Sequence, residues 1–272
     1  MAADVVTQII TARITEHVAE SPFYIPMTGP AARPRRSLKH DDTFIVLDSH
    51  GDIGASAGGP DGLFNADTRY LARLEMVLED VQPLLLGSNM RDDNSALTVD
   101  LTNSDVYRDG RLTLQKDTLH IVRSIFLWRG TAYQRIGLQN HGDHAASFDL
   151  TLLFDNDFAD LFEVRGERRP RRGIGSSKLL GPTDVVLEYC GLDEQTRITA
   201  LHFDPRPTRL SVNAATYHFD LEPGQLTSLF VAVSCNKPIM QKPVPFFRGL
   251  LAHRREMRNS SAGAASIETS NN

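Results

Sequence analysis

The chain has 272 residues, of which 41% are hydrophobic and 23% are charged, as in an ordinary soluble protein. A formal net charge of −5 gives no electrostatic basis for binding nucleic acid or an anionic membrane. The N-terminus lacks the unbroken apolar stretch of a signal peptide, and no segment has the length of a transmembrane span, so we expect a cytoplasmic protein.

The first 42 residues are expected to lie outside the main domain. Apolar residues at helical spacing predict a short amphipathic helix over residues 3–19. Residues 27–41, which read TGPAARPRRSLKHDD, have the composition of a Pro-rich, basic connector. We therefore expect the folded domain to begin at Thr43.

Strand-like sequence begins at Thr43, where FIVLDSHGDI predicts a strand, a turn and a second strand. The spacing of Tyr70–Leu78 also allows a helix. We favour a hairpin there, because Pro83 and the short apolar run at residues 84–86 follow so closely.

The strand signal is strongest in the middle of the chain. A turn at residues 140–143, which read Asn-His-Gly-Asp, suits backbone positions with positive φ. Phe148, Leu150, Leu152 and Phe154 then alternate with period two, which predicts one buried face. Further strand candidates are Val185–Tyr189, Arg197–Phe203, Arg209–Val212, Thr216–Leu221 and Thr227–Ser234. Many short strands separated by turn residues indicate a β-sandwich or barrel, and the tail has a helix candidate at Phe246–Arg258.

The densest acidic cluster follows the alternating strand and consists of Asp155, Asp157, Asp160 and Glu163. In an extended chain the first two carboxylates would lie about 6.5–7 Å apart. That spacing suits an inverting glycosidase, which needs roughly 6.5–9.5 Å, but almost any Asp-x-Asp in a strand has it. We favour a polar strand end whose carboxylates cap turns or pair with Arg165. Binding of sugar hydroxyls, or lining of a neighbouring domain's cleft, comes second, and acid–base catalysis comes third.

A second polar cluster contains Asp67, Arg69 and Arg73. Asp67 and Arg69 could form an ion pair or brace a loop, and such pairs are more often structural than catalytic. The basic run from Arg165 to Arg172 is interpreted as a solvated loop. Trp128 is the only tryptophan, and core packing is favoured over a platform for stacking sugars.

Metal and cofactor chemistry have little support in the sequence. His141 and His144 form a lone HxxH with no third ligand nearby, so no metal site is expected. The two cysteines lack a CxxC partner, and no phosphate-binding or dinucleotide-binding glycine motif is present. We therefore expect no cofactor.

Several stretches together carry a resemblance to a known family. They read GLFNADTRYLARLEMVLED, PLLLGS, DVYRDGRLTLQKDTLHIVRSIFLW and LQNHGDHAASFDLTLLFDNDFADLFEVRG. This text resembles the N-terminal domain of bacterial proteins described as glycogen debranching enzymes, or amylo-α-1,6-glucosidases. The resemblance covers roughly Thr43 to Val233, and its most specific parts are DTRYLARLE and DFADLFEVRG.

The resemblance implies an all-β fold, a β-supersandwich of two large, mostly antiparallel sheets, like the domain that precedes the (α/α)6 barrel of bacterial glucoamylase-type enzymes. The expected organisation is a helix and connector at residues 1–42, the sandwich at 43–240, and a linker at 241–272 that leads toward a C-terminal barrel. In that family the barrel carries the catalytic carboxylates. The present chain is therefore expected to have no catalytic residue and to be inactive by itself.

The resemblance also implies a contact surface for the barrel or its substrate. The expected contact residues are Asp67, Arg69, Asp157, Asp160, Phe162, Glu163 and Arg165. The expected partners are the catalytic barrel, an α-glucan and a second copy of the chain. The alternatives are a self-sufficient glycosidase that uses the carboxylates from Asp155 to Glu163, a stand-alone α-glucan-binding module, or a dimerisation scaffold.

Overall fold

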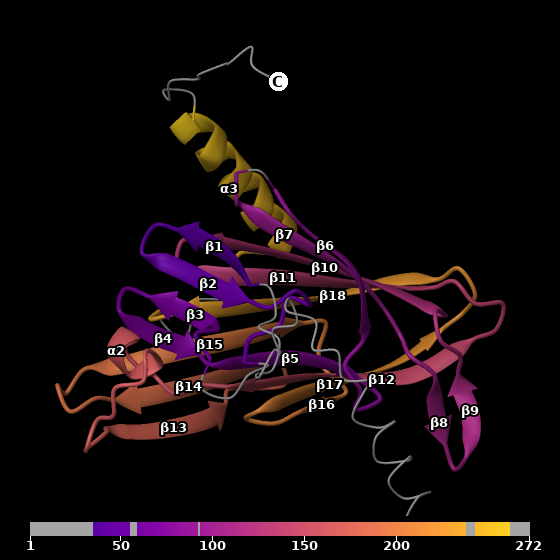
Figure 1. Ribbon diagram of the computed structural model, residues 1–272, viewed down its shortest axis with the longest axis horizontal. Coiled ribbons are helices and arrows are strands. Elements are labelled where there is room, and N and C mark those ends of the chain that lie inside the picture. Colours follow the sequence, from indigo (N-terminus) through magenta and orange to yellow (C-terminus); the bar gives the residue numbers. More distant parts are fainter. Residues whose placement is uncertain (1–34, 55–58, 92, 238–242, 262–272) are drawn as a thin grey trace, which may run out of the picture. The chain divides into compact units, whose positions relative to one another are not determined.

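The structure, a computed structural model, describes residues 35–54, 59–91, 93–237 and 243–261 (Figure 1). The helix predicted over residues 3–19 lies outside the described residues. The predicted start of the domain at Thr43 is too late, because Arg36–His40 already forms strand β1. Leu38 and His40 alternate inward along this strand, which pairs antiparallel with β2 from Arg36 opposite Leu47 to His40 opposite Thr43.

The largest sheet has eight antiparallel strands in the order β13-β14-β15-β18-β11-β10-β7-β6. These strands are, in chain order, β6 (Leu84–Met90), β7 (Ala96–Thr102), β10 (Leu119–Trp128), β11 (Thr131–Asn140), β13 (Ile174–Leu179), β14 (Asp184–Cys190), β15 (Thr196–Asp204) and β18 (Leu226–Cys235).

Two four-stranded antiparallel sheets and a two-stranded hairpin complete the β-structure of the described residues. One sheet has the order β1-β2-β3-β4, with β2 (Thr43–Leu47), β3 (Gly62–Asn65) and β4 (Thr68–Leu71). The other has the order β16-β17-β12-β5, with β5 (Arg73–Leu78), β12 (Ala146–Asp155), β16 (Arg209–Leu210) and β17 (Ala214–Leu221). The hairpin joins β8 (Val106–Arg108) to β9 (Arg111–Leu114).

One hydrophobic core joins the eight-stranded sheet to both four-stranded sheets. The ring of Phe154 on β12 lies 5.7 Å from that of Phe203 on β15. The hydroxyl of Thr199 on β15 donates to the carbonyl of Tyr70 on β4 at 2.7 Å. The predicted inward face of β12 is confirmed, since Phe148, Leu150, Leu152 and Phe154 are at most 1% exposed. Burial of each such side chain stabilises the fold by about 1.5–3 kcal/mol.

The predicted all-β sandwich is therefore confirmed, with one difference in its second layer. In place of one large second sheet, the structure has the two four-stranded sheets. The hairpin predicted for Tyr70–Leu78 is wrong, because β5 pairs with β12 and β6 pairs with β7. Glu79 and Asp80 both have positive φ, and the tight turn from Leu78 to Val81 leads the chain from the four-stranded sheet of β5 into the eight-stranded sheet of β6.

The helix predicted near the end of the chain is confirmed as α3 (Phe246–Ser261). It packs on the outer face of the eight-stranded sheet over a small apolar group, here called the α3 cluster, that consists of Phe126, Tyr133, Ala232 and Phe246. Trp128 packs against this cluster, as the sequence favoured, and its indole N–H donates to Oε2 of Glu256 at 2.8 Å. Residues 246–261 are thus a packed element of the domain.

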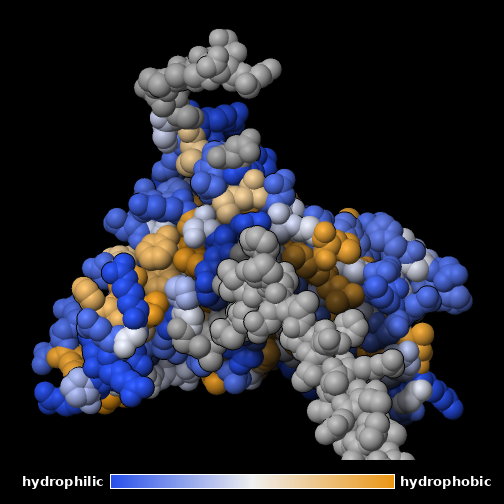
Figure 2. All heavy atoms as spheres, in the orientation of Figure 1, coloured by the Kyte–Doolittle hydropathy of each residue, from blue (hydrophilic) through white to orange (hydrophobic). Residues whose placement is uncertain are grey.

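Hydrophilic side chains cover most of the face drawn in Figure 2 outside the grey atoms, and apolar atoms form smaller patches between them. Arg165–Arg172 lies in a segment that is exposed throughout, which confirms the predicted solvated loop. No helix within the described ranges is long and apolar enough to cross a membrane.

Candidate functional site

Two segments far apart in sequence lie side by side at one end of the sandwich. The backbone N–H of Arg69 in β4 donates to the carbonyl of Ala159 at 2.8 Å, and the N–H of Leu161 donates to the carbonyl of Asp67 at 3.1 Å. These bonds bring together the two motifs, DTRYLARLE and DFADLFEVRG, that carried the resemblance. We call the second of these segments, residues 156–166, the α2 loop.

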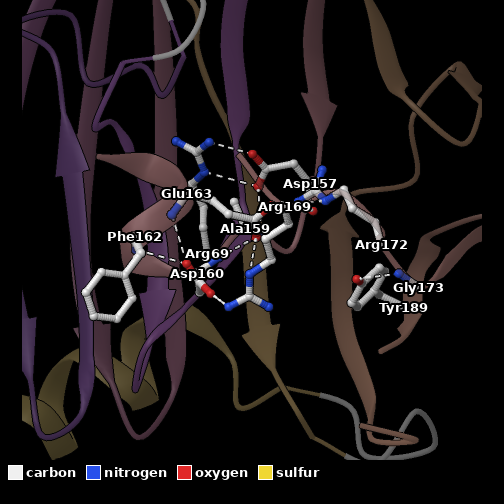
Figure 3. A network of polar contacts seen from close by, with 10 residues as sticks. All are labelled: Arg69, Asp157, Ala159, Asp160, Phe162, Glu163, Arg169, Arg172, Gly173 and Tyr189. Atoms are coloured by element: carbon white, nitrogen blue, oxygen red, sulfur yellow. Dashed lines mark hydrogen bonds and ion pairs between the residues drawn. The ribbon is translucent and has the colours of Figure 1, made fainter. Parts of the chain in front are cut away.

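Arg69 is the anchor that holds the α2 loop (Figure 3). Its Nε and Nη2 donate to the two carboxylate oxygens of Asp157 at 3.1 and 2.5 Å, a bidentate pair. Its Nη1 donates to the carbonyls of Gly59 and Asp61 at 2.9 and 3.1 Å. Of the two alternatives expected for Asp67 and Arg69, the structure therefore supports the loop brace and not an ion pair between them. Asp67 is exposed and contributes its backbone carbonyl to the site, while Arg69 is 8% exposed.

Gly62 makes room for this arginine. A β-carbon added at Gly62 would lie 2.5 Å from Cδ of Arg69 and 2.9 Å from a ring carbon of Phe64. We expect Gly62→Ala to lower the free energy of unfolding by about 1–3 kcal/mol, the usual cost of overpacking a core. Chemical denaturation measures the loss.

The matched control for that substitution is Gly87→Ala, since Gly87 also lies within a strand and nothing lies within 4 Å of an added β-carbon there. We expect Gly87→Ala to leave the free energy of unfolding within about 0.5 kcal/mol of the parent. Equal losses at the two glycines would show that Arg69 is not tightly packed.

A single helical turn, α2 (Leu161–Val164), lies within this loop and is capped at both ends. The carboxylate of Asp160 accepts from the backbone N–H groups of Phe162 and Glu163 at 2.9 and 2.8 Å. The Glu163 carboxylate in turn accepts from the N–H of Asp160 at 3.2 Å, which completes a capping box. The helix ends at Val164 with Arg165 as its C-cap, and the next residue, Gly166, has a φ of 104°, which favours glycine. The expectation that these carboxylates cap a turn is confirmed.

Arginines of the following basic segment close the network. Arg169 pairs with Asp160, and Nε of Arg172 lies 3.3 Å from Oε1 of Glu163. Arg172 also donates from Nη2 to the carbonyl of Asp157 at 2.8 Å. Pairing with Arg165, the other alternative expected for these carboxylates, is not seen among the described residues, where Arg165 is exposed and enters the site through its backbone N–H as the C-cap of α2.

Aromatic side chains lie on both sides of the network. Phe158 is 5% exposed, packs edge-on against Tyr70 at 5.6 Å and stacks on Tyr189 at 5.4 Å. Its φ of 45° is unusual for a bulky residue, so the surrounding packing must hold this conformation. Phe162, by contrast, is 60% exposed, and its ring points away from the network (Figure 3).

A cleft of about 500 Å³ adjoins this network. Its lining combines charged groups with the stacked Phe158 and Tyr189 and consists of Asp67, Thr68, Phe158, Asp160, Glu163, Arg169, Arg171, Tyr189, Gly191, Leu192, Asp193 and Arg197. Hydrogen bonds from Arg197 lower the pKa of Asp193 to about 2, so that carboxylate stays ionised at neutral pH. Tyr189 in β14, Asp193 in the following turn and Arg197 in β15 were not expected from sequence, because these segments carry no motif that distinguishes them.

The carboxylates of the network are engaged in holding the loop. Asp157 is bound by Arg69, while Asp160 and Glu163 accept from backbone N–H groups and pair with arginines. Asp155 ends β12 and is exposed, and Asp157 lies beyond the strand. The strand-rise estimate of their separation therefore does not apply. The described residues hold no group of three or more potential metal ligands.

Comparison with known families decides the relationship. Residues 38–232 match the family described as the N-terminal domain of (some) glycogen debranching enzymes. The chain belongs to this family. The matched span of this debranching-enzyme N-terminal domain contains Arg69, the α2 loop and every strand from β2 to β17.

No curated protein matches the sequence significantly. Among solved structures, a candidate kojibiose phosphorylase from the human microbiome is 14% identical, with a TM-score of 0.48, over 84% of this chain and 33% of that protein. This chain thus spans about a third of that protein's length. A galactose mutarotase-like protein from Lactobacillus casei ATCC 334 is 8% identical, with a TM-score of 0.44, over 75% of this chain and 100% of that one. The Slr1438 protein from Synechocystis sp. PCC 6803 is 10% identical, with a TM-score of 0.47, over 78% and 99%. Similarity at this level transfers no function to the debranching-enzyme domain.

Proposed function

We propose that this chain is a non-catalytic domain of a glycogen-debranching glycoside hydrolase, and that it packs on a catalytic helical barrel and shapes the substrate cleft. Membership in the family supports the debranching context. The observation that carries the proposal is the α2 loop, which is anchored on its inner side by Arg69 and presents an exposed phenylalanine on its outer side.

The α2 loop is held by more polar contacts than an ordinary surface loop needs to keep its conformation. Asp157, Asp160 and Glu163 are each held by several hydrogen bonds or ion pairs. A residue that contacts a partner or a substrate needs a backbone fixed in this way, because its side chain is held in the productive geometry only when neighbouring groups restrain it. Phe162 then supplies an aromatic anchor of the kind that dominates binding surfaces.

Phe162→Ala is the direct test. In the 272-residue chain we expect the free energy of unfolding to change by no more than about 0.5 kcal/mol, because the side chain is 60% exposed. In the protein that carries the catalytic barrel we expect kcat/KM on a branched α-glucan to fall roughly 5- to 100-fold, as for loss of about 1–3 kcal/mol at an interface anchor.

The matched control is Tyr107→Ala on the β8–β9 hairpin, an aromatic residue that is 63% exposed and lies at the opposite side of the view from α2 (Figure 1). We expect this variant to keep the parent kcat/KM. Equal activity of both variants would contradict the proposal, and so would release of sugar from a branched glucan by the 272-residue chain alone.

The 500 Å³ cleft favours a second candidate function, binding of an α-glucan by this domain itself. Its stacked aromatic residues and charged rim offer the apolar face and the hydrogen-bonding groups that a sugar ring needs. Titration calorimetry of the chain with a maltooligosaccharide separates the two candidates, since binding without the barrel supports the second. Light scattering of the same samples would show whether two copies associate.

A further inference from the structure

The face of α3 that packs on the sheet carries a buried histidine, His253, which is 1% exposed. Its ring stacks on Phe126 of β10, with 5.5 Å between centroids and 28° between planes. On the other side it lies 5.7 Å from the ring of His40 in β1. Neither ring nitrogen makes a hydrogen bond of normal geometry with the described residues.

A histidine in this position is unusual. Even the neutral imidazole has one donor and one acceptor, and buried polar atoms are nearly always hydrogen-bonded. A leucine of similar bulk would pack against Phe126 without leaving two such atoms unsatisfied. Position 253 therefore carries a titratable side chain at a site where packing alone would favour an apolar side chain.

The charged groups around the ring come from several elements. His40 lies on β1 and contacts Asp41 at 3.1 Å, Asp93 lies in the turn between β6 and β7, and Glu256 lies on α3 itself. Arg129, in the turn after β10, pairs with Glu256 at 3.7 Å. Burial lowers the pKa of His253 and His40 lowers it further, while the backbone of Ser95 and the carboxylates of Asp93 and Glu256 act in the opposite direction.

We propose that His253 makes the docking of α3 on the eight-stranded sheet depend on pH, so that acidification releases the helix and uncovers the α3 cluster. A proton on the docked ring would place a buried charge between Phe126 and a second histidine, at a ring whose nitrogens make no hydrogen bond of normal geometry with the described residues. Once α3 leaves the sheet, the ring is solvated and regains a pKa of about 6.5. This inference does not depend on the proposed function.

The direction of the effect follows from proton linkage. The docked ring has the lower pKa, so the undocked form binds more protons between that lower value and about 6.5. Docking is therefore at full strength above about pH 6.5 and weakens by up to about tenfold per pH unit below it.

The chain contains its own reporter of docking. Trp128 is the only tryptophan, its indole N–H donates to Glu256 of α3, and the Arg129 guanidinium lies 5.0 Å from the ring centroid. The hydrogen bond from Trp128 lowers the pKa of Glu256, which moves the titration of this carboxylate further from that of a histidine. Undocking would transfer the indole to water and shift its emission to longer wavelength.

The experiment is a pH titration of tryptophan emission and far-UV circular dichroism on the 272-residue chain. We expect a red shift with a midpoint below pH 6.5 while the β-sheet signal is unchanged. His253→Leu should abolish the shift, and His253→Gln, which is polar but does not titrate, should abolish it even where leucine disturbs packing. His40→Phe, which removes a group that lowers the pKa of the docked His253, should narrow the difference between the docked and undocked pKa and move the midpoint to lower pH.

The matched control is His218→Gln, a half-exposed histidine on β17 that pairs with Asp149 and should leave the transition unchanged. A parent chain whose emission is constant from pH 7.5 to 5 would overturn the proposal. An identical midpoint in the parent and in both His253 variants would also overturn it, as would loss of the β-sheet signal together with the red shift.

Discussion

Replacement of Arg123 by methionine is expected to lower the free energy of unfolding by about 3–5 kcal/mol, the usual loss when one partner of a buried ion pair is removed. The side chain of Arg123 is fully buried in the core, and that of its partner Asp52 is 1% exposed. Methionine fills much of the same volume, so the expected loss reflects charge and hydrogen bonding more than a cavity.

The network explains why the loss should be large. Arg123 donates from Nη1 to Oδ1 of Asp52 at 2.5 Å and to the carbonyl of His50 at 2.7 Å. With its amide in the orientation that satisfies both side chains, the Gln134 oxygen accepts from Nε and Nη2 at 2.8 and 2.9 Å. Asp52 also accepts from the N–H of Met76 at 3.1 Å. Loss of the guanidinium leaves several buried acceptors without a donor.

The deficit of this variant should also depend on pH. Burial raises the pKa of Asp52 above its ordinary 3.8, and Arg123 opposes the rise. Without Arg123 the pKa should rise further. A carboxyl whose pKa is higher in the folded state than in the unfolded state lowers stability once the pH rises above the unfolded-state pKa. The folded state then binds more protons than the unfolded state, so removing them costs free energy of folding. We therefore expect a larger deficit at pH 8 than at pH 5.

Urea denaturation at the two pH values measures both effects. The control is Arg73→Gln, which removes an arginine that is about half exposed and pairs with Glu75 at 2.7 Å. A surface pair of this kind contributes about 0–1 kcal/mol. A loss at Arg123 no larger than at Arg73, or one that shrinks as pH rises, would mean that the buried pair does not behave as described.

The sequence alone predicted those parts of the fold that depend on near neighbours. The alternation of Phe148, Leu150, Leu152 and Phe154 located a strand with one buried face, and the helix at residues 246–258 was visible from composition and spacing. Turn chemistry was less decisive. Residues 140–143 do form a turn, but Asn140 holds it by accepting from the N–H of Gly142 at 2.8 Å, and Gly142 is not among the residues with positive φ.

The candidate site shows where sequence reasoning fails. Asp160 and Glu163 are three residues apart, so their capping box could be read locally. The Arg69–Asp157 pair spans 88 residues and depends on two strands lying side by side, which no spacing rule predicts. Asp67, the partner that proximity suggested, instead faces solvent. The family resemblance brought the right segments into view, and only the fold assigned their contacts.

Arg69→Met is expected to lower the free energy of unfolding by about 2–3 kcal/mol, because hydrogen bonds to charged groups contribute about 1.5–3 kcal/mol each and Asp157 keeps some solvent to compensate. The Asp157 side chain is 27% exposed, so the loss should be smaller than at Arg123. Arg69→Lys should also be destabilised, since an ammonium group cannot match the bidentate geometry. Arg91→Met, at an arginine that is 54% exposed, is the control, with an expected change of about 0–1 kcal/mol.

Amide hydrogen exchange distinguishes loosening of the α2 loop from general destabilisation. In Arg69→Met the N–H groups of Ala159 and Phe162, which donate to the carboxylates of Asp157 and Asp160, should exchange faster. The N–H groups of β11 should remain among the slowest to exchange. If the loop positions Phe162 for a partner, Arg69→Met should also reproduce the fall in kcat/KM of Phe162→Ala, and the two changes together should cost less than their sum. Additive effects would mean that Arg69 stabilises the domain without positioning the contact surface.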